Sequence, residues 1–239
     1  MRSARRLAIA VAAAALVMLL ASGPGTRLDL WPWQTGLALL RWAAYTGFVS
    51  AAAGLFLLVL HAMPRWRPLG FTVPVVVVAL SIAAFGPPLL LLSQAKKVPP
   101  IHDITTDVEH PPQFVALLPE RRKAPNGAQY GGADVAAQQK KAYPDIASRL
   151  LPLQPADAMT HAVDAARALG WRIVETDGIE GRIEAVATTT WFGFQDDVVI
   201  RVRPEAQGSR LDVRSASRVG RSDVGANAKR VREFLAKLT

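Results

Sequence analysis

The sequence predicts an α+β protein in which N-terminal transmembrane helices precede a small two-layer sandwich, a four-stranded antiparallel sheet with two helices. Three observations lead to this prediction. Residues 1–95 contain long uncharged runs, residues 96–154 are rich in proline and glycine, and residues 155–239 alternate between helix-like and strand-like apolar patterns. We therefore divide the chain into a membrane region with two to three transmembrane helices, a long wrapping arm that is rich in loops, and an α+β core.

The distribution of charge separates these regions. The chain has 239 residues, no cysteine, 28 Lys+Arg and 19 Asp+Glu, for a net charge of +9. The first 95 residues hold seven arginines and a single acid, Asp29, so they account for +6 of the total (7 − 1) and the rest for +3 (21 − 18). Most of the positive charge in the first region flanks apolar runs. This pattern points to a lipid bilayer as a partner and argues against nucleic acid.

Three uncharged runs have the composition of membrane spans, since about 20 apolar residues cross the hydrocarbon core. They cover approximately residues 7–23, 42–63 and 69–93. The short connection at 64–68 predicts an antiparallel hairpin, and the prolines in 85–88 predict a kink or an early end of the third helix. The first run also has the basic start of a secretory signal peptide, so a retained helix and a cleaved signal both stay open.

The orientation follows from the arginines that flank these runs. The positive-inside rule places both basic groups in the cytoplasm. They are Arg2, Arg5 and Arg6 before the first run, with Arg65 and Arg67 after the second. The third run then leads outward, so we expect a multi-pass protein whose C-terminal domain is extracytoplasmic.

The core is predicted to follow the order helix, four antiparallel strands, helix. The helices are expected at 155–169 and 223–238, and the strands at 171–176, 182–192, 198–204 and 210–218. Pairing Pro204 with Ser209 in the last hairpin puts Arg201 opposite Asp212 and Val199 opposite Arg214. The apolar face of this sheet must be covered by the two helices.

Three separated motifs make the domain recognisable: "IHDITTDVEHPPQF", "FGFQDDVVIRVRP" and "VRSASRVGRSDVGANAKRVREF". In this order they resemble the domain of unknown function 1499 family of bacterial envelope proteins. The resemblance covers roughly residues 98–238 and leaves the membrane region outside. It implies one domain with the arm folded against the sheet, a periplasmic domain anchored in the bacterial inner (cytoplasmic) membrane, and no assigned activity.

The junction between the last strand and the last helix is a candidate anion site, because helix N-termini and arginines bind anions. Its residues are Arg201, Arg214, Arg218, Arg221, Ser222 and Asn227. The alternative is structural, with Ser222 as the helix N-cap and the arginines paired with nearby acids. Asp197 lies diagonal to Arg214, whereas Arg218 has no acid in the hairpin register. We therefore expect Arg218 to be available to a ligand or to the carboxylates of the arm.

The arm contains a weaker candidate for a metal site. His102, Asp103, Asp107, Glu109 and His110 fall within nine residues, and imidazoles with carboxylates are ligands for divalent ions. Their spacing matches no established ligand motif. A solvated stretch with turns fixed by its own side chains is the alternative.

No catalytic set can be assembled from the sequence. It lacks a G-x-S-x-G elbow, and Asp196 and Asp197 point to opposite faces of a strand. No cofactor can be named. We expect a non-enzymatic, membrane-anchored extracytoplasmic module that binds an anionic envelope component or a protein partner. The alternative is a membrane-surface hydrolase or metal-dependent enzyme that uses the acidic arm.

Overall fold

The computed structural model describes residues 2–63 and 71–238, which form a helical unit and an α+β unit. The helical unit runs to Gln94 and also takes in residues 190–193. The remaining residues, from Ala95 onward, belong to the α+β unit. This second unit contains residues of both the arm and the core.

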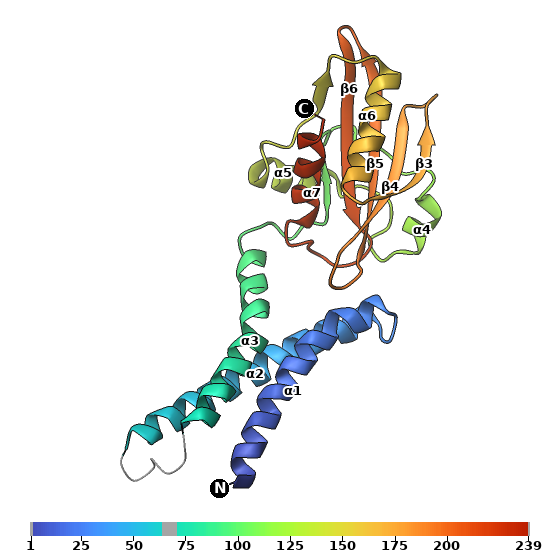
Figure 1. Ribbon diagram of the computed structural model, residues 1–239. Helices are drawn as coiled ribbons and strands as arrows, with labels where there is room; N and C mark the ends of the chain where they lie inside the picture. The colour runs from blue at the N-terminus through green and yellow to red at the C-terminus, as the bar shows by residue number, and fades with distance from the viewer. Residues whose placement is uncertain (1, 64–70, 239) are drawn as a thin grey trace. The chain divides into compact units, whose positions relative to one another are not determined.

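The helical unit consists of α1 (Arg2–Arg27), α2 (Trp33–Ala62) and α3 (Thr72–Ala95), shown in Figure 1. All three are long and apolar enough to cross a membrane. Helix α3 continues through Pro87 and Pro88, so the early end considered for this helix does not occur. The predicted connection at 64–68, with Arg65 and Arg67, lies outside the described residues.

Small residues allow α2 and α3 to pack closely. A Cβ atom added to Gly54 would lie 2.8 Å from Cγ2 of Val78, and one added to Gly47 would lie 3.1 Å from the carbonyl oxygen of Ser81. Ser81 and Ala84 of α3 are buried at this contact. Glycine at helix contacts permits close approach of backbones, which is the usual basis of helix association in lipid.

The α+β unit is built on one antiparallel sheet in the order β1-β6-β5-β4-β3, with β2 also paired to β6. Its strands are β1 (Asp103–Thr105), β2 (Arg149–Leu151), β3 (Arg172–Asp177), β4 (Arg182–Thr188), β5 (Gln195–Glu205) and β6 (Gly208–Ser217). The predicted number of four strands is therefore wrong. The two additional strands come from the arm, and three residues are too few to show an alternating pattern.

The central hairpin has the register that the sequence predicts. Arg201 pairs with Asp212 and Val199 with Arg214. The turn requires Gly208, whose φ is 132° and where a Cβ atom would lie 2.1 Å from the carbonyl oxygen of Leu151. A side chain at this position would therefore collide with β2.

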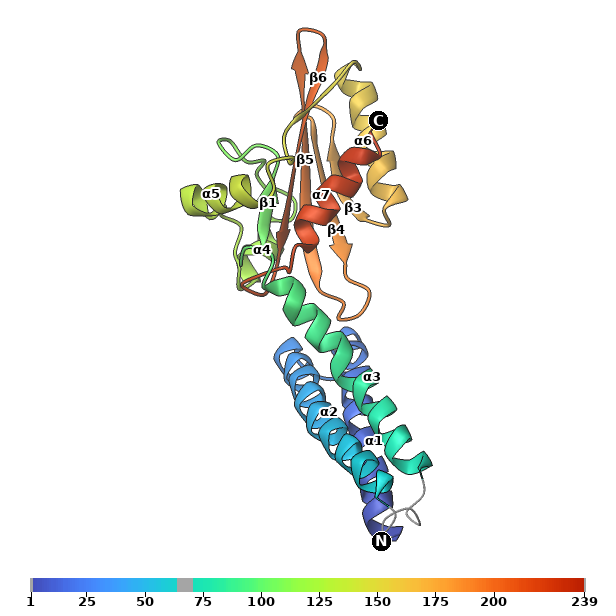
Figure 2. The same cartoon turned by 90° about the vertical axis from the view of Figure 1, so that its left-hand side faces the viewer.

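Helices α6 (Pro155–Ala168) and α7 (Ala226–Ala236) cover one face of the sheet, as predicted (Figure 2). Trp171 stacks on Phe234 within this core. Helix α7 begins three residues later than expected, because Gly225 adopts a left-handed φ of 83° as its N-cap residue. The carboxylate of Asp223 accepts the backbone N–H groups of Gly225 and Asn227. The prediction of Ser222 as the N-cap is therefore wrong.

The arm covers the opposite face of the sheet. It includes α4 (Leu118–Lys123) and α5 (Gly132–Ala142), which lie on the other side of the sheet from α6 and α7 in Figure 2. Phe114 and Leu117 of the arm form a second, smaller apolar cluster with residues of the sheet, namely Val186, Val199 and Ala216. The central strands β4, β5 and β6 are thus covered on both faces, on one by the helices and on the other by the arm.

Candidate functional site

The arm-side face of the sheet carries a buried layer of ion pairs. Because successive strand residues point to opposite faces, the arginines at alternate positions of β5 and β6 all lie on this face. They are Arg201, Arg203, Arg210 and Arg214. The arm supplies two acids to three of them: Asp103 pairs with Arg214, and Asp107 pairs with Arg201 and Arg203. The layer is therefore assembled from segments about 100 residues apart in the sequence.

Arg214 is the most enclosed of these four arginines, with no exposed surface. Its Nε and Nη2 atoms donate to the two carboxylate oxygens of Asp103 at 3.0 and 2.7 Å. It also donates to the backbone carbonyl oxygens of Pro112 and Ala128. Two-point pairing of this kind with additional acceptors is what a buried guanidinium requires. Four of its five N–H groups are thus engaged, and with no exposed surface Arg214 is unavailable to a ligand.

Two aromatic rings complete the surroundings of Arg214. Its guanidinium lies 5.0 Å from the ring centroid of Phe114 and 5.6 Å from that of Tyr130. Burial, reinforced by the charge of Asp103, raises the pKa of Tyr130 to about 12, so the phenol stays neutral. The guanidinium of Arg121 lies over Phe114 as well, at 5.2 Å, and burial lowers its pKa against the opposing effect of Asp197.

Arg218 does not have the free guanidinium that we expected. Its Nε and Nη2 atoms donate to Asp197 at 2.8 to 3.0 Å, and Asp197 also pairs with Arg121 at 3.5 Å. The hairpin register suggested Asp197 as the partner of Arg214, but the partner of Arg214 is Asp103 from the arm. Hairpin register alone could not show this, because the competing acid comes from another segment. The neighbouring Asp196 pairs with a helix residue on the opposite face.

Glu184 in β4 is a member of the layer that sequence reasoning missed. Its carboxylate is fully buried and accepts three successive backbone N–H groups of the arm, at 2.7 to 2.9 Å. These belong to Val115, Ala116 and Leu117. Nε of Arg182 lies 3.1 Å from the same carboxylate. The signal for Glu184 was an acid within an otherwise apolar strand, where a buried charge requires several hydrogen-bond donors.

The most accessible part of the layer is the Asp212 cluster, which we define as Arg201, Arg203, Arg210, Asp107 and Asp212. Asp212 pairs with Arg201 at 2.9 Å, with Arg203 at 3.2 Å and with Arg210 at 3.8 Å. Asp107 pairs with the first two of these arginines. Burial by itself raises the pKa of Asp212, but hydrogen bonds from Ser148 and Arg201 outweigh burial and hold it below the ordinary value. The cluster thus contains three guanidinium groups and two carboxylates.

A cavity of about 210 Å³ adjoins this cluster. It is lined by Pro112, Gln113 and Val115 of the arm and by Glu180, Arg182, Val199 and Arg201 of the sheet and its turn. Arg201 belongs to both the cavity and the Asp212 cluster. Its Nε is buried and has no hydrogen-bond partner among the described residues. Two arginines and one acid, Glu180, therefore line the cavity together with apolar side chains, and Arg201 keeps a buried Nε donor that no described residue accepts.

The structure distributes the six predicted anion-site residues over separate places. Arg201 lines the cavity, whereas Arg214 and Arg218 are engaged as described above. The remaining three surround the loop before α7. Arg221 is exposed, Ser222 accepts the N–H of Val224, and buried Asn227 donates to Ser217 and to the carbonyl oxygen of His102.

The candidate metal residues of the arm are likewise dispersed among other contacts. The three carboxylates among these candidates are each paired with a basic side chain: Asp103 with Arg214, Asp107 with Arg201, and Glu109 with Lys140. Nδ1 of His102 lies 3.4 Å from the carbonyl oxygen of Arg221, and the backbone N–H of His110 donates to Asp107. Within residues 2–63 and 71–238, no three His, Asp or Glu side chains form a group that could hold a metal ion.

Comparison with known proteins places the α+β unit in a family. The family model described as "Protein of unknown function (DUF1499)" matches residues 103–238. The match begins at β1 and includes the Asp212 cluster, the cavity and α7, and it covers more than half of the chain. No curated protein matches the chain. The match and the three motifs agree, and the chain belongs to the DUF1499 family of proteins of unknown function.

Proposed function

We propose that the protein is a membrane-anchored module of the bacterial envelope whose α+β unit binds an anionic envelope component. The site is the Asp212 cluster with the adjoining cavity. The observation that carries the proposal is the imbalance of charge in this cluster, where three guanidinium groups face two carboxylates. A phosphate or carboxylate group of a ligand would supply the missing negative charge.

The excess of positive charge lies at the most exposed side chains of the cluster. Arg203 and Arg210 are directly opposite each other on β5 and β6, a position in which like charges repel. Their side chains are 46% and 38% exposed. Arg210 pairs with Asp212, and Arg203 shares Asp212 and Asp107 with Arg201. An arrangement that served structure alone would place an acid at one of these two positions. An incoming anion can bind both guanidinium groups without displacing the pairs beneath them.

The structural surroundings favour binding over catalysis. The metal-dependent alternative would require the arm carboxylates to be released from their basic partners, and Asp103 is held by two hydrogen bonds from a fully buried arginine. The cavity, in contrast, has a shape that is already formed by the arm and the sheet. Binding sites are usually such preformed concave surfaces with a few polar groups.

We expect phosphate binding to depend on Arg203. Full-length protein in neutral detergent, titrated with inorganic phosphate in a calorimeter, should lose about tenfold or more in affinity in the Arg203→Gln variant, because one charge-assisted hydrogen bond is removed. The matched control is Arg172→Gln, which removes an exposed arginine from β3. Arg203→Gln and Arg172→Gln should both unfold at the wild-type temperature. Equal phosphate affinity of the wild type and Arg203→Gln would refute the site.

The proposed location rests on the three apolar helices and the arginines at their ends. The positive-inside rule then predicts that the C-terminus is extracytoplasmic. A reporter enzyme that works only outside the cytoplasm should be active when it is fused to the C-terminus. A reporter that works only in the cytoplasm should be inactive there, and the reverse pattern would overturn the orientation.

A further inference from the structure

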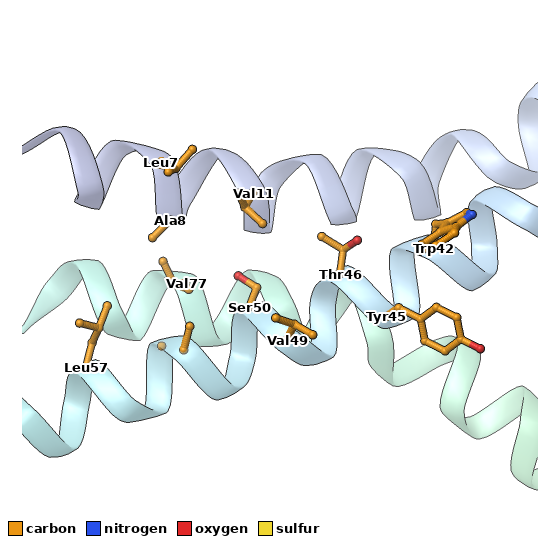
Figure 3. A pocket seen from close by; sticks show the side chains of 12 residues that line it. Leu7, Ala8, Val11, Trp42, Tyr45, Thr46, Val49, Ser50, Leu57 and Val77 are labelled. Carbon is orange, nitrogen blue, oxygen red and sulfur yellow. The ribbon is translucent and has the colours of Figure 1, made fainter.

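The helical unit contains an elongated groove of about 500 Å³ between its three helices (Figure 3). Side chains of α1 face those of α2 across it, and α3 contributes Val77. The lining residues are Leu7, Ala8, Val11, Trp42, Tyr45, Thr46, Val49, Ser50, Ala53, Gly54, Leu57 and Val77. Except for three hydroxyl groups and an indole N–H, the lining side chains are hydrocarbon, so the groove suits an apolar occupant.

The groove has a closed floor and an open side. Ser50 and Val77 are 5% and 1% exposed and form its floor. Leu7 and Val49 are 65% and 68% exposed and stand at its rim. A molecule in the surrounding bilayer could therefore enter from the side without any separation of the helices.

The dimensions of the groove distinguish between two kinds of apolar occupant. Along α2 the lining extends from Trp42 to Leu57, which corresponds to about 22 Å at a rise of 1.5 Å per residue. The whole space between the lining atoms is about 1000 Å³, which over this length gives a mean cross-section of no more than roughly 45 Å². An α-helix 10–12 Å wide has a cross-section of roughly 80–110 Å². The groove can therefore take an extended hydrocarbon chain along its length, but it cannot enclose a partner helix.

The charge at one end of the groove indicates which lipid fits. Arg5 precedes the lining residue Ala8 by three positions, so the two lie on neighbouring parts of the α1 surface, and Arg6 follows directly. Asp29 is the sole acid in the first 95 residues, and it lies beyond the opposite end of α1. The two arginines therefore have no acid of the membrane region to neutralise them. Basic residues beside a pocket between membrane helices are a recognised arrangement for anionic headgroups.

We infer that this groove binds an anionic phospholipid, with one acyl chain along α2 and the phosphate beside Arg5 and Arg6. The inference rests on the membrane anchoring in the proposed function, but it concerns a different site from the Asp212 cluster. An anionic phospholipid accounts for the apolar lining, the narrow cross-section and the basic end of the groove. A second copy of the chain would account only for the apolar lining.

Electron paramagnetic resonance of spin-labelled lipids tests the inference on the full-length protein in vesicles. Phosphatidylglycerol and phosphatidylcholine, each labelled near the end of an acyl chain, report the fraction of motionally restricted lipid. We expect a restricted population that prefers the anionic lipid. Arg5→Gln should lower this preference about fivefold, because one basic residue near the headgroup is lost. Ala53→Phe, which fills the groove, should remove the specifically restricted population for both lipids. Ala52→Phe places the same bulk on an exposed position outside the lining and is the control.

Each other outcome contradicts the inference in a recognisable way. A restricted population that is unchanged in Ala53→Phe would show that the groove is not the lipid site. The restricted population of the wild type should be the same at high and at low protein density. If it is lost at high protein density and returns when the protein is diluted in lipid, a second copy of the chain is the occupant. Phosphate binding by the α+β unit should be unaffected by Ala53→Phe, so failure of the lipid site and failure of the Asp212 cluster are separate results. Failure of the protein to float with the vesicles would reject the anchoring and the lipid site together.

Discussion

Replacing Arg214 by leucine should lower the free energy of unfolding of the α+β unit by about 3–5 kcal/mol, because the change leaves a buried carboxylate without its cation. The carboxylate is that of Asp103, which is 4% exposed and receives both of its strong hydrogen bonds from Arg214. The carbonyl oxygens of Pro112 and Ala128 would also lose a donor. Hydrogen exchange of β6 amides in the full-length protein, followed by mass spectrometry, measures the change.

Two further variants separate the loss of the ion pair from the loss of bulk. The double replacement of Arg214 and Asp103 by leucine should recover much of the stability, since a buried pair can often be replaced by apolar side chains at little cost. Arg149→Leu changes an exposed arginine of β2 and should have a small effect. A cost below about 1 kcal/mol for Arg214→Leu would mean that Asp103 reaches water when its partner is absent.

Replacing Glu184 by leucine should destabilise the α+β unit by about 3 kcal/mol or more, because three backbone N–H groups lose a charged acceptor. Leu117 is buried, so its N–H group has no access to water as a replacement. Val115, which shares this carboxylate, also lines the cavity beside Arg201. Glu184→Leu should therefore also weaken phosphate binding, because the arm segment that lines the cavity is released. The effect expected of Arg214→Leu, in contrast, is on the stability of the α+β unit. Hydrogen exchange of residues 114–123 should accelerate more than that of β5.

The control for Glu184→Leu is Glu205→Leu, which alters an exposed acid at the end of β5, outside the cavity. It should change neither the exchange of residues 114–123 nor the unfolding temperature. If Glu184→Leu accelerates exchange equally throughout the sheet, the arm and the sheet unfold as one cooperative unit. In that case the carboxylate stabilises the whole unit and does not position the cavity wall specifically.

Local physical chemistry was sufficient to predict much of this architecture from the sequence. Uncharged runs of membrane-spanning length located the three N-terminal helices. Alternation of apolar residues, together with the turn at 205–208, determined the register of the β5–β6 hairpin. Periodicity also located α6 and α7 on the apolar face of the sheet. In each case the information lies within a short window, because the pattern of burial repeats every two or every 3.6 residues.

Tertiary structure decided which acid neutralises which arginine. Asp103 and Arg214 are 111 residues apart, and no local pattern distinguishes Asp103 from Asp197 as the partner of that arginine. The same limitation hid β1 and β2, which are three-residue segments of the arm that become strands by pairing with β6. Local sequence patterns thus predict the three N-terminal helices, α6, α7, the β5–β6 hairpin and the face on which the side chains of that hairpin lie. Which of those charges are buried and paired, and which remain accessible to a ligand, depends on the folded arm. Burial and pairing involve segments that meet only in three dimensions.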